Sequence, residues 1–382
     1  MLPGEMAGHR AAHIIFPHLK VPRQDMRDII FPRQKFRIGL FVPMSGSAGI
    51  WGPSCIASAE VAVDELNKFS GIQNLEVELV LVDAAFENGD DLYYLANELI
   101  ERNEIQAIVG MHISAVRQKL VKVVDGRIPY VYTALYEGGE NAPGVYTIGE
   151  TPDCQLGPAL QSITNRHKIK NWGLIGNEYV WPRASHAYAK RYLKTLGNKV
   201  SYEKYLPIGR RVPDRLIEEL SHSDVEAVLL SLVGQDAIDF NRAFGEAGLD
   251  KKIVRLSCAI EENGLLAIGA ENLKRLYSSA SYFATLNTPE NNAFKERYYA
   301  LHKMRAPMLN FMGQSLYEGV HFLASLTENT PEDMQGFRLS PSHPLAYRSA
   351  RGGVYLNNRK KKLPVYLARA DGYRFSVVDH LY

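Results

Sequence analysis

The stretch Gln106-Ala-Ile-Val-Gly110-Met-His-Ile-Ser114-Ala decides the fold. Residues 107–109 form an apolar run that is too short for a helix and suits a buried strand. Gly110 then interrupts the run, and Ser114 occupies the cap position before residues 115–124. That last segment carries apolar residues at helical spacing on one face, namely Val116, Leu120, Val121 and Val124. The stretch therefore predicts a buried strand, a short loop and an amphipathic helix.

Ser114 is the first candidate binding residue. A serine at the start of a helix that follows a parallel strand presents its hydroxyl beside unpaired backbone N–H groups. Such a corner suits a carboxylate, an amide oxygen or a phosphate. For a lone serine, a purely structural cap remains the alternative.

Strands and helices alternate on both sides of this stretch. The first run has strands at 36–42, 75–82, 107–109 and 128–132, and helices at 55–69, 91–102 and 114–124. The second run has helices at 153–166, 183–196, 213–220 and 235–247, and strands at 171–175, 199–205, 227–231 and 253–256. Two more helices at 289–304 and 309–326 precede strands near 353–356, 363–369 and 373–378. The alternation predicts the α/β class, with two doubly wound parallel-sheet lobes that bind ligands at the carboxyl ends of their strands.

Length and composition exclude several classes of protein. A chain of 382 residues is long enough for two domains, and 46% hydrophobic with 23% charged residues is typical of a soluble globular protein. A net charge of +2 gives no basis for direct nucleic-acid binding. The cysteines, Cys55, Cys154 and Cys258, are too far apart in sequence for a metal motif and form no disulfide framework. No apolar stretch approaches the roughly 18 residues that a membrane span needs.

Six stretches resemble the type I periplasmic-binding-protein family. They are Ile38-Gly-Leu-Phe-Val-Pro-Met-Ser-Gly46, Val109-Gly-Met-His-Ile-Ser114, Tyr132-Thr-Ala-Leu-Tyr-Glu-Gly138, Ile175-Gly-Asn-Glu-Tyr-Val-Trp-Pro-Arg183, Val233-Gly-Gln235 and Asn287-Thr-Pro289. Within the family, the sequence is similar to the amide, urea and branched-chain amino acid receptors, above all to the cytosolic amide sensor that controls aliphatic amidase expression. The resemblance implies two lobes joined by a hinge that the chain crosses three times. It places residues 36–150 plus 281–342 in lobe one and 151–280 plus 343–382 in lobe two, after a flexible arm over residues 1–35.

The resemblance and the loop positions together indicate a ligand site between the lobes. The candidate ligand-binding residues are His112, Ser114, Tyr132, Ala134, Tyr136, Tyr179, Trp181, Gly234, Gln235 and Glu261. Tyrosines offer an apolar wall and a hydroxyl, although either one could equally be a core residue bonded to the backbone. The resemblance implies that Tyr179 and Trp181 enclose the ligand opposite Ser114. Glu261 or Glu262 could receive a ligand ammonium group, or serve only to favour the dipole of the helix that follows.

Two positions depart from the amide-sensor pattern. His112 stands where that family has an aromatic hydroxyl, and Ala134-Leu135 replaces its Thr-Pro pair. Losing a hydrogen-bonding group at a buried site costs about 1–3 kcal/mol, so a ligand larger than acetamide, or differently polar, is expected.

The sequence favours a receptor over an enzyme. The sequence has no nucleophile elbow, Walker loop or zinc-protease motif, and Asp83 and Glu87 alone do not establish an acid–base pair. We therefore predict a non-enzymatic receptor without cofactor or metal that closes on a short-chain amide, a urea-like solute or an amino acid. A cytosolic sensor of amide metabolism with a regulator protein as partner is favoured, because residues 1–36 contain no recognisable export signal. The alternative is the solute-binding subunit of an ABC transporter with a permease as partner, in the periplasm if the start position is wrong; a homodimer is left open in either case.

Overall fold

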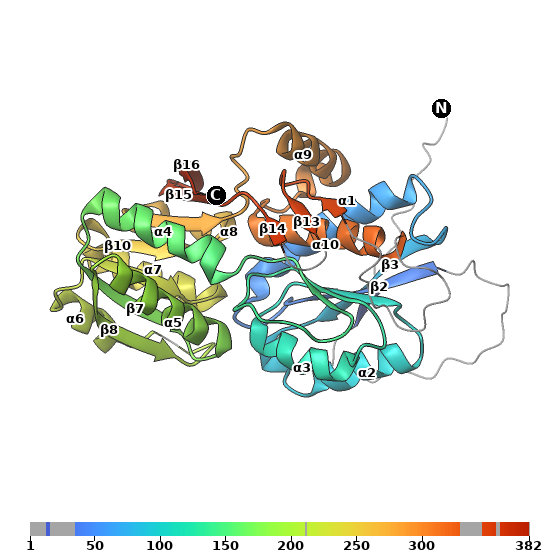
Figure 1. The fold of residues 1–382 in the computed structure, drawn as a ribbon, viewed down its shortest axis with the longest axis horizontal. Helices are drawn as coiled ribbons and strands as arrows, with labels where there is room; N and C mark the ends of the chain where they lie inside the picture. The colour runs from blue at the N-terminus through green and yellow to red at the C-terminus, as the bar shows by residue number, and fades with distance from the viewer. Residues whose placement is uncertain (1–12, 16–34, 211, 329–345, 357–359, 382) are drawn as a thin grey trace, which may run out of the picture.

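The computed structural model describes residues 13–15, 35–210, 212–328, 346–356 and 360–381. It consists of two α/β lobes that lie side by side, with the earliest and latest helices together in one of them (Figure 1). This architecture confirms the predicted fold class of two parallel-sheet lobes.

The first lobe is built on a six-stranded parallel sheet with the order β1-β3-β2-β4-β5-β6. Its strands are β1 (His13–Ile15), β2 (Lys35–Val42), β3 (Glu76–Asp83), β4 (Ala107–Gly110), β5 (Tyr130–Tyr132) and β6 (Val145–Thr147). The apolar run in β4 is fully buried, as its sequence predicts, and lies between β2 and β5. Most of the arm at residues 1–35 lies outside the described residues; within it, β1 pairs with β3 at the edge of the sheet.

Helices cover both faces of this sheet (Figure 1). They are α1 (Gly52–Asn67), α2 (Asp91–Glu101), α3 (Ser114–Val124), α9 (Pro289–His302) and α10 (Phe311–Glu328). The late helix α10 packs on α1 and on strands β4 and β5, so it returns to the first lobe after the second lobe has been completed. This return places α10 against the central strands of the first sheet.

The second lobe has a seven-stranded sheet with the order β16-β15-β11-β10-β9-β7-β8. Its strands are β7 (Asn171–Asn177), β8 (Lys199–Leu206), β9 (Ala227–Ser231), β10 (Val254–Ser257), β11 (Leu276–Ala280), β15 (Tyr366–Asp371) and β16 (Arg374–His380). The first five are parallel to one another, and β15 and β16 add an antiparallel edge. The sequence analysis missed both β6 and β11.

The helices of the second lobe follow its strands in alternation. They are α4 (Pro152–His167), α5 (Val180–Thr195), α6 (Asp214–Ser221), α7 (Gly234–Glu246) and α8 (Glu262–Ile268). Short 3-10 helices are η1 (Gly49–Trp51), η2 (Phe86–Asn88), η3 (Leu249–Lys251), η4 (Ala270–Asn272) and η5 (Lys303–Arg305). Across the part of the chain that is described, none of the helices is both long enough and apolar enough to cross a membrane.

The chain passes between the lobes three times, as predicted. The crossings lie between β6 and α4, between β11 and α9, and between the small third sheet and β15. That third sheet is antiparallel and consists of β12 (Ala346–Arg348), β13 (Val354–Leu356) and β14 (Lys360–Lys362). Tyr347 packs edge-on against Phe322 of α10 and donates to Glu318 Oε2 (3.1 Å), which holds the small sheet on the first lobe. The chain thus reaches the second sheet only at β15, whereas the sequence analysis drew this boundary at residue 343.

A buried polar network joins the three crossings. Glu150, on the first crossing, accepts hydrogen bonds from the backbone N–H (3.3 Å) and the hydroxyl of Ser281, on the second. Arg351, which precedes the third, donates to Glu150 Oε1 (3.2 Å), to Ser281 Oγ and to Gln314 of α10. The Arg351 and Glu150 side chains are only 2% and 4% exposed, so we call Glu150, Ser281 and Arg351 the hinge network.

Candidate functional site

The carboxyl ends of the two sheets face each other, and loops from both lobes meet there. The backbone N–H of Gln235, at the start of α7, donates to the carbonyl of Ser47 in the first lobe (2.7 Å). The Asn263 side-chain amide donates to the carbonyl of Ile50 (3.0 Å). Gly234 has φ +51°, and a Cβ there would lie 2.1 Å from Ser47 O. The lobes therefore form a closed contact, which we call the lip, and only glycine at position 234 permits it.

The first-lobe side of the lip is held by two carboxylates. Asp83, at the end of β3, accepts hydrogen bonds from Met44 N (2.8 Å) and from Ser45 Oγ (2.5 Å). Glu87 accepts from both the backbone N–H (2.9 Å) and the hydroxyl (2.6 Å) of Ser47. These acids are thus committed to shaping the loop before η1, and the structure offers no acid–base role for them.

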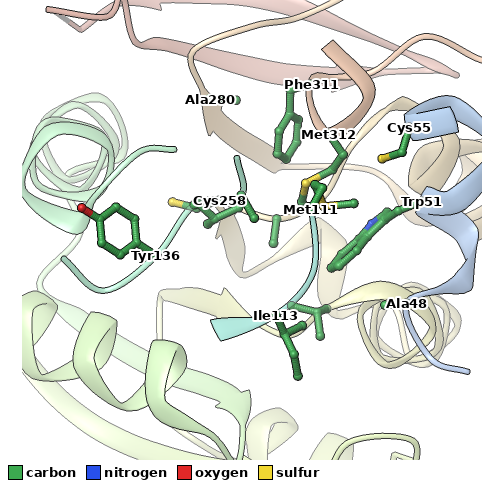
Figure 2. Close-up of a cluster of buried hydrophobic side chains, with 14 of the residues drawn as sticks. Ala48, Trp51, Cys55, Met111, Ile113, Tyr136, Cys258, Ala280, Phe311 and Met312 are labelled. Carbon is green, nitrogen blue, oxygen red and sulfur yellow. The ribbon is translucent and has the colours of Figure 1, made fainter. Parts of the chain in front are cut away.

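Behind the lip lies a layer of buried apolar side chains that come from both lobes. Figure 2 shows Trp51, Met111, Phe311 and Met312 directed toward one another, with Cys258 of the second lobe beside them. All five residues are at most 5% exposed. Trp51 precedes α1, Met111 follows β4, and Phe311 and Met312 begin α10. The layer is therefore assembled from segments that are distant in sequence.

Ser114 lies at the edge of this layer, in the first turn of α3. The sequence analysis made it the helix cap, and this is wrong: Ile113 has the extended backbone of the cap (φ −70°, ψ 154°), and Ser114 is already helical. The Ser114 hydroxyl is buried and has no hydrogen-bond partner of good geometry among the described residues, although the Tyr132 hydroxyl lies close to it. The neighbouring Tyr132 hydroxyl donates instead to the carbonyl of His112 (2.6 Å).

Arg117 lies one helical turn after Ser114 on α3, and its side chain is 3% exposed. It donates through Nη2 to Glu137 Oε1 (2.6 Å), and its Nε lies 3.2 Å from Glu140 Oε2. The guanidinium stacks near the rings of Tyr132 (5.1 Å) and Tyr136 (5.2 Å). Arg117 Nη1 and Glu137 Oε2 are buried without a hydrogen-bond partner in the described part of the chain. We call Ser114, Arg117, Glu137 and Glu140 the α3 corner.

His112 is buried and makes its hydrogen bonds within the first lobe. Its Nδ1 lies 3.2 Å from the carbonyl of Ile113, and its Nε2 lies 3.0 Å from the Tyr130 hydroxyl. A neutral ring with its proton on Nδ1 satisfies both contacts, because a carbonyl only accepts and a hydroxyl can donate. Burial lowers the pKa of His112 to about 3, with the charge of Arg117 adding to the effect. Both ring nitrogens are thus already engaged within the protein.

The other first-lobe candidates lie around the α3 corner and the first crossing. Tyr136 is buried, and its hydroxyl accepts a hydrogen bond from Thr147 (2.8 Å). Its ring meets that of Tyr132 edge-on at 6.3 Å. Ala134 lies beside the first crossing, where a Cβ on Gly149 would come within 1.9 Å of its carbonyl oxygen. The two tyrosines therefore form the side of the corner, and Ala134 contributes close backbone packing.

Tyr179 and Trp181 belong to the second lobe and lie at the start of α5, which begins at Val180 rather than at residue 183 as predicted. Their rings pack at 6.3 Å, and Trp181 is 4% exposed. Burial raises the pKa of Tyr179, and Tyr132 and Glu137 of the first lobe add to the effect. Helix α5, which Tyr179 precedes, contacts α3 of the first lobe, so Tyr179 lies near the α3 corner. Gln235, by contrast, turns its exposed side chain to Asp239 (2.7 Å), so only its backbone takes part in the lip.

Glu261 supplies a second acid on the far side of the apolar layer. It is the cap residue of α8 and is 3% exposed. Burial raises its pKa to about 8; Glu262 adds to the rise, and the nearby Trp51 indole opposes it. Glu262 itself accepts a hydrogen bond from Ala284 N (2.8 Å) and so holds the second crossing. Of the two acids, only Glu261 lies against the first-lobe wall of the cleft.

The sequence of both lobes matches a known protein family. A sequence model of the family described as "Periplasmic binding protein" matches residues 35–339, well over half of the chain. The chain belongs to the periplasmic binding protein family. Proteins of this family bind small solutes, so a non-enzymatic binding protein is the class to which the two lobes and their cleft belong.

Solved structures agree with the fold of this periplasmic binding protein. An ABC transporter solute-binding protein from R. palustris in complex with 4-hydroxybenzoate has a TM-score of 0.79 and 18% identity, over 91% of this chain and 96% of that one. The branched-chain amino acid transporter protein LivJ from Streptococcus pneumoniae, in complex with isoleucine, gives 0.75 and 14%, over 90% and 99%. The leucine-binding protein LivK from Thermotoga maritima gives 0.74 and 14%, over 91% and 98%. Identities this low establish the fold alone.

Several residues of the site were missed by the sequence analysis. Trp51, Met111, Phe311 and Met312 were not singled out, and α10 meets the cleft only through its return to the first lobe. Arg117 was not named as a candidate either. Its position three residues after Ser114 was a usable signal, since residues at this spacing share one helix face.

Proposed function

We propose that this periplasmic binding protein is the solute-binding subunit of an ABC transporter and closes its lobes over one small solute with an apolar body. The observation that carries the proposal is the lip, where Gln235 N donates to Ser47 O across the cleft. Behind it, the apolar layer takes side chains from both lobes, so a solute held there would contact both. A ligand that contacts both lobes favours the closed state over the open one, because only differential contacts shift such an equilibrium.

The solutes bound by the structural neighbours support a small solute with an apolar body. The R. palustris protein was crystallised with 4-hydroxybenzoate and the S. pneumoniae protein with isoleucine, each a compact apolar body with a polar end. In the present chain, Trp51 and the methionines would hold the apolar body, and Ser114 and Tyr179 would meet the polar end. Amides, urea-like solutes and amino acids are the ligand classes to test first. The proposal also places the protein on the outer side of the membrane, in place of the cytoplasmic location that sequence analysis favours.

A second candidate function is the cytosolic amide sensor. It is supported by one observation: the segment Glu178-Tyr-Val-Trp-Pro-Arg183, which resembles the amide branch, leads into helix α5, and α5 contacts α3. In that case the closed state would be read by a soluble regulator protein rather than by a permease.

Binding and role can be tested separately. Thermal-shift screening of short amides, ureas, amino acids and aromatic acids, followed by calorimetry, should reveal a solute that stabilises the protein by linkage and is recovered unchanged. Deleting the gene and measuring uptake of that labelled solute by whole cells then assigns the role. Loss of uptake supports the transporter subunit. Normal uptake with lost solute-dependent gene expression would assign the sensor instead, and hydrolysis of the solute by the pure protein would contradict both.

A further inference from the structure

The α3 corner contains buried polar atoms that the protein itself does not satisfy. Within the described residues, Arg117 Nη1 and Glu137 Oε2 lack a hydrogen-bond partner, and Ser114 Oγ has only the nearby Tyr132 hydroxyl, in poor geometry. Ser114 and Arg117 share one face of α3, and Glu137 is joined to Arg117 through its other oxygen at 2.6 Å. Buried polar atoms are almost always paired, so this group of incompletely paired atoms calls for a partner from outside the chain. The corner offers that partner both donors and an acceptor.

The charge at this corner disfavours an anion. Arg117 is the cation of the group, and it is already paired with Glu137 and with Glu140 (3.2 Å). Glu140 is itself held in place by the backbone N–H groups of Asn141 (3.1 Å) and Ala142 (3.0 Å). One guanidinium between two carboxylates leaves the corner with an excess of one negative charge. A ligand carboxylate beside it would meet the unpaired Glu137 oxygen, and like charges at such distances repel strongly at a buried site.

The opposite wall of the cleft does not supply the missing cation. Glu261 is the ionisable group there, with Glu262 next to it, and the first-lobe residues that act on it are Trp51 and Cys55. The indole N–H of Trp51 is buried and lacks a hydrogen-bond partner of good geometry among the residues described. Burial raises the pKa of Glu261 to about 8, so near neutral pH this end of the apolar layer offers a ligand carboxylate a mostly neutral carboxyl group and no cation.

We propose that Glu137 and Glu140 are specificity-determining residues that neutralise Arg117 and so exclude solutes with a free carboxylate from this cleft. The inference rests on the proposed function, since it concerns which solutes the cleft accepts. A carboxamide meets the corner where the matching acid does not: its carbonyl oxygen accepts from Ser114 or Arg117, and its N–H donates to Glu137 Oε2. This chemistry separates the chain from its neighbour in complex with 4-hydroxybenzoate, which is an acid.

Matched pairs of probes with one carbon skeleton test the exclusion. Benzamide and benzoate, isovaleramide and isovalerate, and leucinamide and leucine are titrated into the full chain by calorimetry at pH 7.5. The parent should bind at least one amide at least tenfold more tightly than its matched acid. In the Glu137→Gln/Glu140→Gln variant, Arg117 loses its two carboxylate partners and can pair with a ligand carboxylate. Affinity for the acid should therefore rise, and the ratio of amide affinity to acid affinity should fall at least tenfold. Glu98→Gln, which removes an exposed acid paired with Arg102, should leave the ratio unchanged.

The design includes a check on folding and separates two kinds of failure. Circular dichroism and thermal melting must show that the double variant is folded. If the double variant does not fold, the single variant Glu140→Gln, which keeps the ion pair of Arg117 with Glu137, is used in its place. A parent that binds an acid as tightly as its amide, or a folded variant whose ratio does not change, overturns the proposal and leaves the solute-receptor function standing. Failure of every amide to bind also overturns it. The proposed function falls only if the wider solute panel gives no binding either.

Discussion

The hinge network and the α3 corner are both buried and both contain one arginine and carboxylate oxygens, but they use them differently. In the hinge, Arg351 donates to Glu150, Ser281 and Gln314, and Glu150 accepts from Ser281 twice. At the corner, Arg117 Nη1 and Glu137 Oε2 lack partners among the described residues, and Ser114 Oγ has none of good geometry. Mutual pairing fixes a geometry, whereas unpaired atoms leave a surface whose hydrogen bonds are completed by something else.

The two regions therefore differ in their effect on the stability of the empty protein. A buried polar group without a partner costs about 1–3 kcal/mol, so the corner lowers the stability of the empty protein. A ligand that pairs these atoms recovers that cost on binding. The hinge, which every open or closed state must keep, contains no such deficit. Substitutions in the two regions should therefore separate stability from affinity, with the largest effect expected in the hinge.

Arg351→Met should give the largest loss of stability. It leaves Glu150 buried without its cation at the point where all three crossings meet, and breaking one partner of a buried pair costs about 3–5 kcal/mol. Chemical denaturation gives the free energy of unfolding. Arg102→Met, at an exposed pair with Glu98, is the control and should change stability by less than about 1 kcal/mol. Equal effects of the two variants would show that the hinge network is dispensable.

Acid should destabilise the protein through His112, a paired residue adjacent to the unpaired corner. Burial lowers its pKa to about 3 in the folded state, against about 6.5 when unfolded. Below pH 6.5 the unfolded chain therefore binds a proton that the folded chain refuses, so stability falls by about 1.4 kcal/mol per pH unit from this group. Above pH 6.5 the group makes no difference. Unfolding free energies measured from pH 7 to pH 5 should fall less steeply for His112→Gln than for the parent, while the exposed His222→Gln should follow the parent. A parallel slope for His112→Gln would contradict the assignment.

The fold could be predicted largely from apolar runs, and its exceptions have a physical cause. Strands β4 and β9 are buried on both faces and consist almost entirely of apolar residues, which is typical of parallel sheets. Strand β11 was missed because Ser278 and Ser279 occupy its centre. These serines are buried only because Ser278 donates to Ile260 O (2.9 Å) and Ser279 to Gln155 O (3.0 Å). Such distant partners cannot be recognised from local sequence.

The sequence predicts where the site residues lie along the chain, but not how their charges and hydrogen-bonding groups are paired. Ser114, Tyr132 and Tyr179 follow strands or open helices at the expected edge, so their positions follow from topology. Whether the hydroxyl of Ser114 is paired depends on a shift of a single residue in the start of α3. The neutralisation of Arg117 depends on acids some twenty residues away in a loop without regular structure.

Closure should depend on Gly234 at the lip. Gly234→Ala would place a Cβ 2.1 Å from Ser47 O, so the closed contact cannot form without a shift of the backbone. Affinity for the tightest-binding amide should fall at least tenfold, equivalent to about 1.4 kcal/mol. Gly248→Ala is a matched control, because Gly248 also has a positive φ (+71°) but a Cβ added there would meet no atom within 4 Å. Both variants share the left-handed backbone cost of about 1–2 kcal/mol, so the difference in affinity isolates the lip. Equal affinities would show that binding does not require this contact.

Ser114→Ala should have the smallest effect on the stability of the empty protein, which should stay the same or rise, while ligand affinity should fall. Its hydroxyl is buried with no partner of good geometry among the described residues, so removing it should leave the free energy of unfolding unchanged or raise it by up to about 1 kcal/mol. Ligand affinity should nevertheless weaken by about 1–2 kcal/mol, the worth of one buried hydrogen bond formed only in the complex. Ser278→Ala provides the contrast, because that hydroxyl is equally buried but paired, so its removal should destabilise the empty protein and spare affinity. Denaturation without ligand and calorimetry with it measure the two quantities independently. If Ser114→Ala destabilises the empty protein as Ser278→Ala does, Ser114 is a structural residue and the contrast between hinge and corner fails at this position.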